Sequence, residues 1–107
     1  MVQFFHPARE DISLTAVLAA LGEPARMGII RKLWGSESGQ NCGAAAPCQD
    51  MPRSTLSSHM RILREAGLIR THKQGVENIS VVRLEDMEAR FPGLLPSILE
   101  FDGQQQL

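Results

Sequence analysis

Small hydroxyl side chains and one arginine fall on the same face of a segment with helical periodicity. If Leu56 is placed at zero on a wheel of 100° per residue, Met60, Leu63 and Gly67 lie within about 40° of it and form an apolar stripe. The opposite face, between about 100° and 200°, carries Ser54, Ser57, Ser58 and Arg61. Small hydroxyls allow close approach and can bond phosphates or base edges, and arginine binds guanine or phosphate. This face predicts a helix that enters the DNA major groove. A serine-rich surface helix is the alternative.

Two cysteines, Cys42 and Cys48, are the second constellation that could do chemistry. Thiolates bind soft metals and metalloids, or oxidise to a disulfide. Two thiolates do not complete a tetrahedral zinc site, and nothing in the sequence requires a histidine to join them. Three interpretations therefore stay open: structural thiols, a redox pair, and a metal or metalloid site. We predict no cofactor.

A β-hairpin is expected directly after the hydroxyl-bearing helix. Residues 68–72 and 79–83 are rich in β-branched side chains, and Gly75 between them can adopt the positive φ that such a turn needs. Lys73, Gln74 and Asn78 near the tip suit contact with a DNA backbone or minor groove. An ordinary solvated hairpin would also carry polar residues there. Helix, strand, turn and strand in this order is the layout of a winged helix.

The rest of the chain is expected to be helical scaffold in one domain. Capping residues and apolar spacing predict helices over about 13–21, 24–34, 42–46, 84–91 and 94–101. The domain should cover residues 1–101, with a short N-terminal arm over 1–11, and residues 102–107 should fray. The overall fold class is mostly α with a small β-hairpin.

The first of these helices should contribute to a dimer interface. We expect its Leu14, Val17, Leu18 and Leu21 to pack against the domain. Its remaining side carries Ile12, Ala16 and Ala20. An apolar residue on the far side of a satisfied helix needs a second surface, so that side should meet a partner together with residues of the 84–99 region.

Composition and charge limit the class of protein. The chain has 107 residues, of which 43% are hydrophobic, and a net charge of −1. No apolar run approaches the roughly 18 residues of a membrane span, and the N-terminus does not resemble a signal peptide, so we expect a cytoplasmic protein. A Gly-rich phosphate loop, a nucleophile elbow and an HExxH motif are all missing, so we expect no enzyme.

The distribution of charge favours DNA more than the net charge does. Residues 53–73 hold five basic residues against one acidic residue, a balance of +4. Residues 85–102 hold one basic residue against five acidic ones, a balance of −4. Arg53 and Arg64 flank the hydroxyl face. The basic segment coincides with the predicted recognition unit, and the acidic end should point away from DNA.

Two stretches resemble ArsR-type (ArsR/SmtB) repressors. Leu21-Gly-Glu-Pro-Ala-Arg-Met-Gly-Ile-Ile-Arg-Lys-Leu33 looks like the second-helix signature of that family, and Ser54 to Ile69 closely resembles its recognition helix and exit. The resemblance implies a homodimeric winged helix-turn-helix repressor that pairs through its terminal helices and leaves its operator when an inducer binds. The positions that match the family's DNA-reading residues are Ser54, Thr55, Ser57, Ser58, His59 and Arg61.

Some features of the chain depart from that resemblance or leave it open. Residues 36–51 are small and polar where the family has a Leu- and Ala-rich first helix of the motif. The cysteine pair lies about where the family's arsenic sensors carry theirs, whereas residues 84–101 lack the histidine of its other zinc site. His59 lies at the border of the apolar face, so packing and phosphate contact are both open.

We therefore predict a sequence-specific DNA-binding regulator, with double-stranded DNA, a second copy and a possible small inducer as partners, and no membrane. One alternative is a thiol-redox or metalloid sensor acting through Cys42 and Cys48. Another is a winged-helix module that binds protein rather than specific DNA, which the near-zero net charge would suit.

Overall fold

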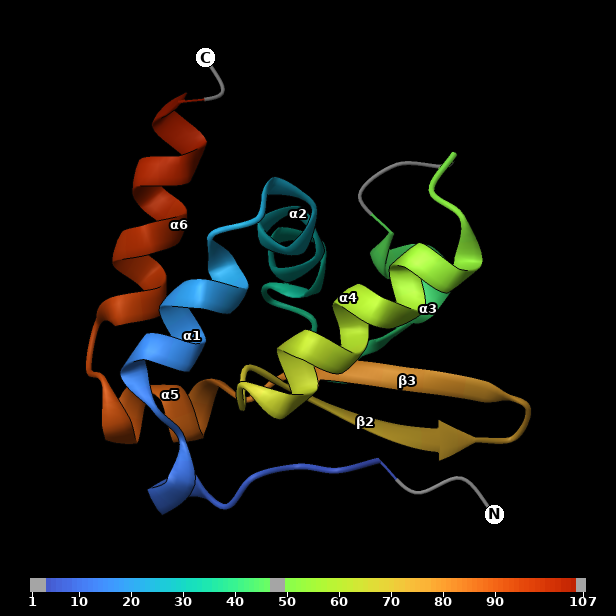
Figure 1. The fold of residues 1–107 in the computed structure, drawn as a ribbon, viewed down its shortest axis with the longest axis horizontal. Helices are drawn as coiled ribbons and strands as arrows, with labels where there is room; N and C mark the ends of the chain where they lie inside the picture. Colours follow the sequence, from blue (N-terminus) through green and yellow to red (C-terminus); the bar gives the residue numbers. More distant parts are fainter. Residues whose placement is uncertain (1–3, 47–49, 106–107) are drawn as a thin grey trace.

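The computed structural model describes residues 4–46 and 50–105, and it combines helices with one small sheet (Figure 1). A 3-10 turn, η1 (Arg9–Asp11), precedes six helices: α1 (Leu14–Leu21), α2 (Pro24–Leu33), α3 (Cys42–Ala45), α4 (Arg53–Glu65), α5 (Leu84–Arg90) and α6 (Leu94–Gln105). The strands are β1 (Gln40–Asn41), β2 (Ile69–Gln74) and β3 (Glu77–Val82). This architecture confirms the predicted fold class.

The sheet is antiparallel, with strand order β1-β3-β2. β2 and β3 form the expected hairpin, which extends from the helical body in Figure 1. Their strands are longer toward the tip than predicted, because Lys73 pairs with Asn78 and Gln74 with Glu77. β1 was not predicted, and its Gln40 and Asn41 pair with β3 opposite Ser80 and Ile79.

Local features of the sequence explain where α1, α2 and α3 begin. The Ser13 hydroxyl accepts a hydrogen bond from the Ala16 N–H at 3.2 Å and caps α1. Pro24 begins α2, where its missing N–H costs no helical bond. Asn41 caps α3 by accepting from the Ala44 N–H at 2.8 Å. This cap stabilises the short helix that the sequence predicted near residues 42–46.

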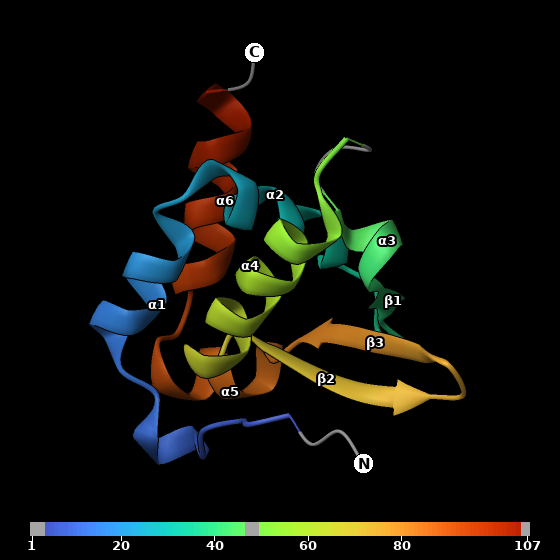
Figure 2. The same ribbon diagram turned by 45° about the vertical axis from the view of Figure 1, so that its right-hand side comes forward.

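A single apolar core joins α1, α2, α4, α5, α6 and the base of the sheet. Its fully buried large side chains include Ile12, Val17, Ile29, Ile30, Leu33, Met60, Leu63, Leu68, Ile69, Met87 and Leu95. This core fixes α4 against α2 while the opposite side of α4 stays at the surface, in front of α2 and α6 in Figure 2. The hydroxyl-bearing helix is therefore anchored to the fold by its apolar stripe.

The predicted division of the first helix is wrong at four positions, whereas Val17 and Leu21 are buried as expected. Ile12, expected to meet a partner, is only 1% exposed, and Ala20 is buried as well. Leu14 and Leu18, expected in the core, are 44% and 45% exposed. The segment Leu14–Leu21 is apolar nearly throughout, so its periodicity does not distinguish one side from the other.

Gly67 explains why Ile12 lies inside. Gly67 ends α4 with φ of +87°, and a Cβ built on it would lie 2.6 Å from Cγ1 of Ile12. Both the left-handed backbone and the close approach require glycine. The Ile12 side chain therefore packs against the exit from α4 rather than against another copy.

The C-terminal end is also more ordered than predicted. α6 continues to Gln105, where fraying was expected over 102–107, and residues 106–107 lie outside the described part of the chain. Asp102 lies 3.4 Å from the Arg31 guanidinium, which joins this end of α6 to α2.

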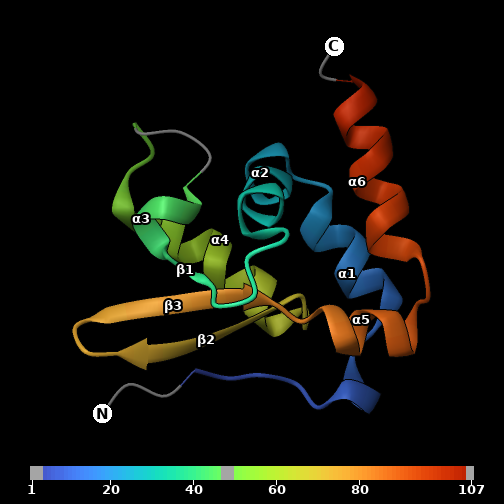
Figure 3. The ribbon, with the colours of Figure 1, turned by 180° about the vertical axis from the view of Figure 1, so that it is seen from behind.

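The N-terminal arm runs alongside β2 (Figure 3). The Thr71 N–H donates to Nε2 of His6 at 3.0 Å, and the buried Arg83 donates to the Pro7 carbonyl at 2.9 Å. Phe4 lies under the Arg64 guanidinium, with 4.6 Å from Cζ to the ring centre. The arm thus covers the outer edge of the hairpin and reaches α4.

Candidate nucleic-acid interface

The burial of α4 separates its two faces as the sequence predicted. Leu56, Met60 and Leu63 are buried in the core. The exposed side carries Arg53, Ser54, Thr55, Ser57, Ser58 and Arg61. Since the small hydroxyls add little bulk, the α4 backbone can approach another surface closely. The result is a polar helix face with an arginine near its middle.

Among the residues predicted to contact DNA, His59 forms a contact within the domain. Its ring is half-buried, and its Nδ1 lies 3.2 Å from the Arg26 guanidinium of α2. Arg26 also donates to the Ala20 carbonyl at 2.6 Å. His59 therefore joins α4 to α1 and α2 through Arg26. Sequence reasoning missed Arg26 because 33 residues separate it from His59.

The five basic residues of segment 53–73 differ in what they contact. Arg64 lies over Phe4, and Arg70 lies 3.7 Å from the Asp86 carboxylate. Arg53, Arg61 and Lys73 are exposed, and none of them forms an ion pair with another described residue. These three cations are the ones available to phosphates or bases.

Asp86 is the acidic centre behind this face. Its carboxylate accepts from Nε of Arg9 at 2.7 Å and from Nε of Arg83 at 2.8 Å. Burial acts to raise the pKa of Asp86, but the two hydrogen bonds together with the positive charges of Arg83 and Arg9 outweigh it, and the pKa lies below its ordinary value. Asp86 therefore stays ionised and holds arginines at the base of β2, away from the exposed face of α4.

The hairpin tip presents fewer polar groups than expected. Lys73 and Gln74 are exposed at the end of β2. Asn78 lies within β3, half-buried, with its Oδ1 buried and without a hydrogen bond to the described residues. Val76 occupies the turn and is 94% exposed. Its position after Gly75 in a two-residue turn was the signal that could have found it.

The predicted thiol pair lies only partly within the described residues. Cys48 lies outside the described residues, and for Cys42 the structure describes the backbone, which begins α3. Over residues 4–46 and 50–105, no three His, Cys, Asp or Glu side chains gather as metal ligands. The interpretations of the cysteine pair therefore stay as predictions. In the same described ranges, no helix is long and apolar enough to cross a membrane.

Comparisons with known proteins agree with this geometry. Residues 21–72, which contain α2, α3 and α4, match a family model described as a helix-turn-helix domain. The chain is 30% identical over 89 residues to YceK of Bacillus subtilis, an uncharacterised HTH-type transcriptional regulator, and the match covers 83% of this chain and 89% of that protein. The chain belongs to the HTH-type transcriptional regulators.

A solved structure confirms the type of fold. The crystal structure of an ArsR family transcriptional regulator superposes with a TM-score of 0.62 over 92% of this chain and 97% of the other, at 24% identity. The ArsR-type winged-helix fold predicted from the sequence is therefore confirmed. The HTH-type family is one of regulators, so this chain is a DNA-binding transcriptional regulator and not an enzyme.

Proposed function

We propose that this regulator is a homodimeric repressor that binds a palindromic operator and leaves it in response to a signal. The observation that carries the proposal is the division of α4, whose apolar stripe is buried while its hydroxyls and Arg61 are exposed. An exposed helix face of this chemistry fits the major groove, where arginine binds guanine and hydroxyls bond bases or phosphates. In the cytoplasm, the operator would be within reach.

Each protomer contributes a recognition helix and a wing in this proposal. Ser54, Ser57, Ser58 and Arg61 would face the bases. Arg53 at the start of α4 and Lys73 in the wing would contact phosphates, which position the protein without distinguishing sequence. Gln74 adds a polar contact beside Lys73, whereas the partly buried Asn78 and the Arg26-bound His59 would support the interface from within.

Dimerisation is proposed from exposed apolar side chains on the terminal helices. Leu14 and Leu18 on α1 and Phe101 on α6 are 44%, 45% and 63% exposed. α1 and α6 both lie at the end of the molecule away from the hairpin tip (Figure 1). A two-fold axis at this end would cover these residues and leave both copies of α4 and both hairpins open to DNA.

The proposal is tested by DNA binding and stoichiometry together. Fluorescence anisotropy with duplexes from the protein's own upstream region should find a site with two half-sites about one helical turn apart. Sedimentation of the complex should give two protomers per site. Affinity should fall steeply with salt, because phosphate contacts release counterions. A folded monomer that prefers no duplex over heparin would contradict the proposal.

A further inference from the structure

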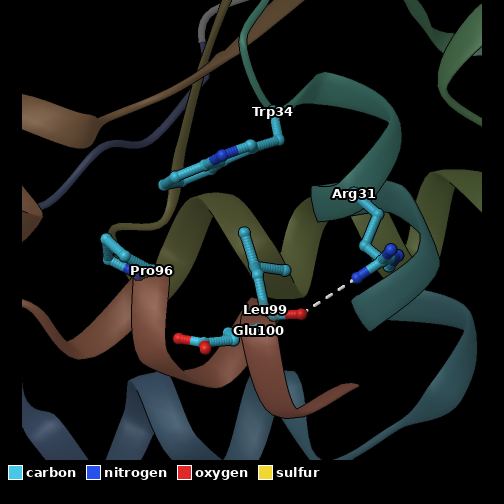
Figure 4. Close-up of a pocket in the computed structure, with 5 residues that line it drawn as sticks. All are labelled: Arg31, Trp34, Pro96, Leu99 and Glu100. Atoms are coloured by element: carbon cyan, nitrogen blue, oxygen red, sulfur yellow. Dashed lines mark hydrogen bonds between the residues drawn. The ribbon is translucent and has the colours of Figure 1, made fainter. Parts of the chain in front are cut away.

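A pocket of about 390 Å³ lies between the end of α2 and one flank of α6. Its lining is Arg31, Trp34, Pro96, Leu99 and Glu100. Figure 4 shows the Trp34 ring on one side and Pro96 and Leu99 across from it on α6, with the Glu100 side chain extending along α6 next to Leu99. The volume lies within the roughly 300–1,000 Å³ of small-molecule sites, which typically combine apolar walls with a few polar groups.

The Arg31 guanidinium already has partners within the fold, so it does not supply a free positive charge to the pocket. Its Nη1 donates to the Leu99 carbonyl at 3.1 Å and lies 3.4 Å from the Asp102 carboxylate. In Figure 4 its guanidinium turns toward Leu99 and away from the space under Trp34. An anionic ligand would have to compete with Asp102 for this group. The pocket therefore does not favour anions.

Glu100 has the opposite character. Glu100 is one of the lining residues, and within the described part of the chain its carboxylate accepts no hydrogen bond and pairs with no cation. The indole of Trp34 lines the same pocket, and an indole face attracts cations more strongly than the other aromatic rings do. A smaller hollow of about 210 Å³ shares Trp34 as a wall and has Glu37 in its lining. These two hollows beside the indole thus have one glutamate each in their linings.

We propose that this pocket binds a compact organic cation, a protonated or quaternary amine with an apolar body. The indole of Trp34 and the carboxylate of Glu100 would hold the charge, while Pro96 and Leu99 would cover the apolar part. Since Arg31 and Asp102 neutralise each other, the pocket carries the single negative charge of Glu100. A pocket with one net negative charge suits a ligand with one positive charge.

The pocket lies on a different side of α6 from Phe101, the residue of this helix proposed to contact the second copy. At 100° per residue, Phe101 is turned about 140° from Pro96 and about 100° from Glu100. A ligand in the pocket would therefore not have to displace a second copy packed against Phe101. It would instead act on the junction of α6 with α2.

α2 connects this junction to the recognition helix. Arg31 on α2 binds α6 through Leu99, and Arg26 on the same helix contacts His59 of α4. A cation that shifts α6 against α2 would change the support of α4 through this helix. We therefore expect the ligand to weaken operator binding. This regulatory part rests on the proposed repressor function, whereas binding in the pocket does not.

Trp34 makes the binding test direct, because it is the only tryptophan in the chain and there is no tyrosine. The full-length protein is titrated with benzyltrimethylammonium, and separately with benzenesulfonate, while indole fluorescence is recorded. We expect a saturable change with the cation alone. In Glu100→Gln the cation affinity should fall about fivefold, as for the loss of one partly exposed charge. The matched control Glu10→Gln, which removes an exposed carboxylate from η1, should bind as the parent does.

Calorimetry on Trp34→Leu provides a readout that does not depend on fluorescence, and it should show at least a fivefold loss of cation affinity. Preference for benzenesulfonate, or unchanged cation binding in Glu100→Gln, would overturn the proposed site. Operator binding is then measured with and without saturating benzyltrimethylammonium. A protein that binds the cation but keeps its operator affinity would overturn the regulatory part. A protein that binds the cation but no operator would instead contradict the proposed function and leave the pocket assignment standing.

Discussion

At the scale of single residues, the basic side chains of the recognition unit divide by their contacts. Arg64 and Arg70 contact Phe4 and Asp86, so they stabilise the domain. Arg61 extends from the middle of the exposed face of α4 without an ion-pair partner in the described chain. A cation without an internal partner is the one whose removal should affect binding and leave folding intact.

Arg61→Ala should therefore weaken operator binding by about 1–3 kcal/mol and relax the preference at one base pair. The reason is loss of a contact to a base edge rather than loss of general attraction to DNA. Competition anisotropy with single-base operator variants measures both effects. Lys32→Ala, which removes an exposed cation from α2, is the control for net charge and should bind nearly as the parent does.

Lys73→Ala distinguishes backbone contact from base contact. It should weaken all duplexes alike and lower the salt slope by about one unit, because one phosphate contact is lost. If Arg61→Ala and Lys73→Ala both bind as the parent does, the exposed face of α4 is not the one that meets DNA.

Gly67 should be sensitive to substitution, because its backbone is left-handed and the Ile12 side chain lies against it. Gly67→Ala places a Cβ 2.6 Å from Ile12 in a left-handed backbone, so we expect a loss of at least about 2 kcal/mol in the free energy of unfolding. Gly75→Ala is the matched control, since its φ is +65° and nothing lies within 4 Å of the added carbon. It should cost only about 1 kcal/mol. Urea unfolding of both variants checks this, and equal losses would show that the contact with Ile12 is unimportant.

At the scale of elements, α4 could be predicted because its sequence alternates clearly between apolar and polar sides. Leu56 and Met60 repeat at helical spacing among polar residues, so only one side of α4 could be buried in the core. In contrast, α1 is apolar on nearly every side, and only the approach of Gly67 to Ile12 determines which side is buried. β1 consists of Gln40 and Asn41, two polar residues whose pairing with β3 depends on partners far along the chain.

The candidate site shows the same limit of local information. The exposed face of α4 followed from periodicity within one helix, and the structure agrees with it. The partners of His59, Arg64 and Arg70 did not, because Arg26, Phe4 and Asp86 come from other elements. Residue spacing indicates which side chains share a face, whereas their contacts across the fold need the tertiary structure.

The N-terminal arm is an element whose attachment should depend on pH. His6 accepts the Thr71 N–H through Nε2, which requires a neutral imidazole. Burial lowers the pKa of His6, and the positive charges of Arg70, Arg83 and Arg64 lower it further. The folded pKa thus lies below the unfolded value of about 6.5. Stability from this contact is complete above about pH 6.5 and is lost as pH falls through the folded pKa.

Urea unfolding between pH 5 and pH 8 measures this effect. The free energy of unfolding of the parent should fall on acidification within this window, and His6→Ala should reduce that fall. His72→Ala, on the same strand, keeps the His6 contact and should retain the parent's response. An identical pH dependence in the parent and in His6→Ala would mean that the arm contributes nothing to it.

At the scale of the whole molecule, the exposed features occupy separate regions. The exposed face of α4 and the hairpin carry Arg53, Arg61 and Lys73, which form no ion pair with another described residue. The terminal helices carry the exposed Leu14, Leu18 and Phe101, away from the hairpin tip (Figure 1). A dimer built at that end keeps both recognition helices available, and each operator half-site then binds one protomer.

Leu18→Glu should shift the protein from dimer to monomer and weaken operator binding at the same time. A carboxylate in place of a 45% exposed leucine leaves the core intact but would lose its hydration in an apolar interface. Sedimentation equilibrium and anisotropy on the same samples measure the two effects. Ala16→Glu is the informative comparison, because Ala16 lies about 160° from Leu18 around α1 and lines a shallow hollow with Ile62 and Glu65 of α4. It should remain dimeric. Dissociation of Ala16→Glu with an unchanged Leu18→Glu dimer would place the interface on the side of α1 that faces α4.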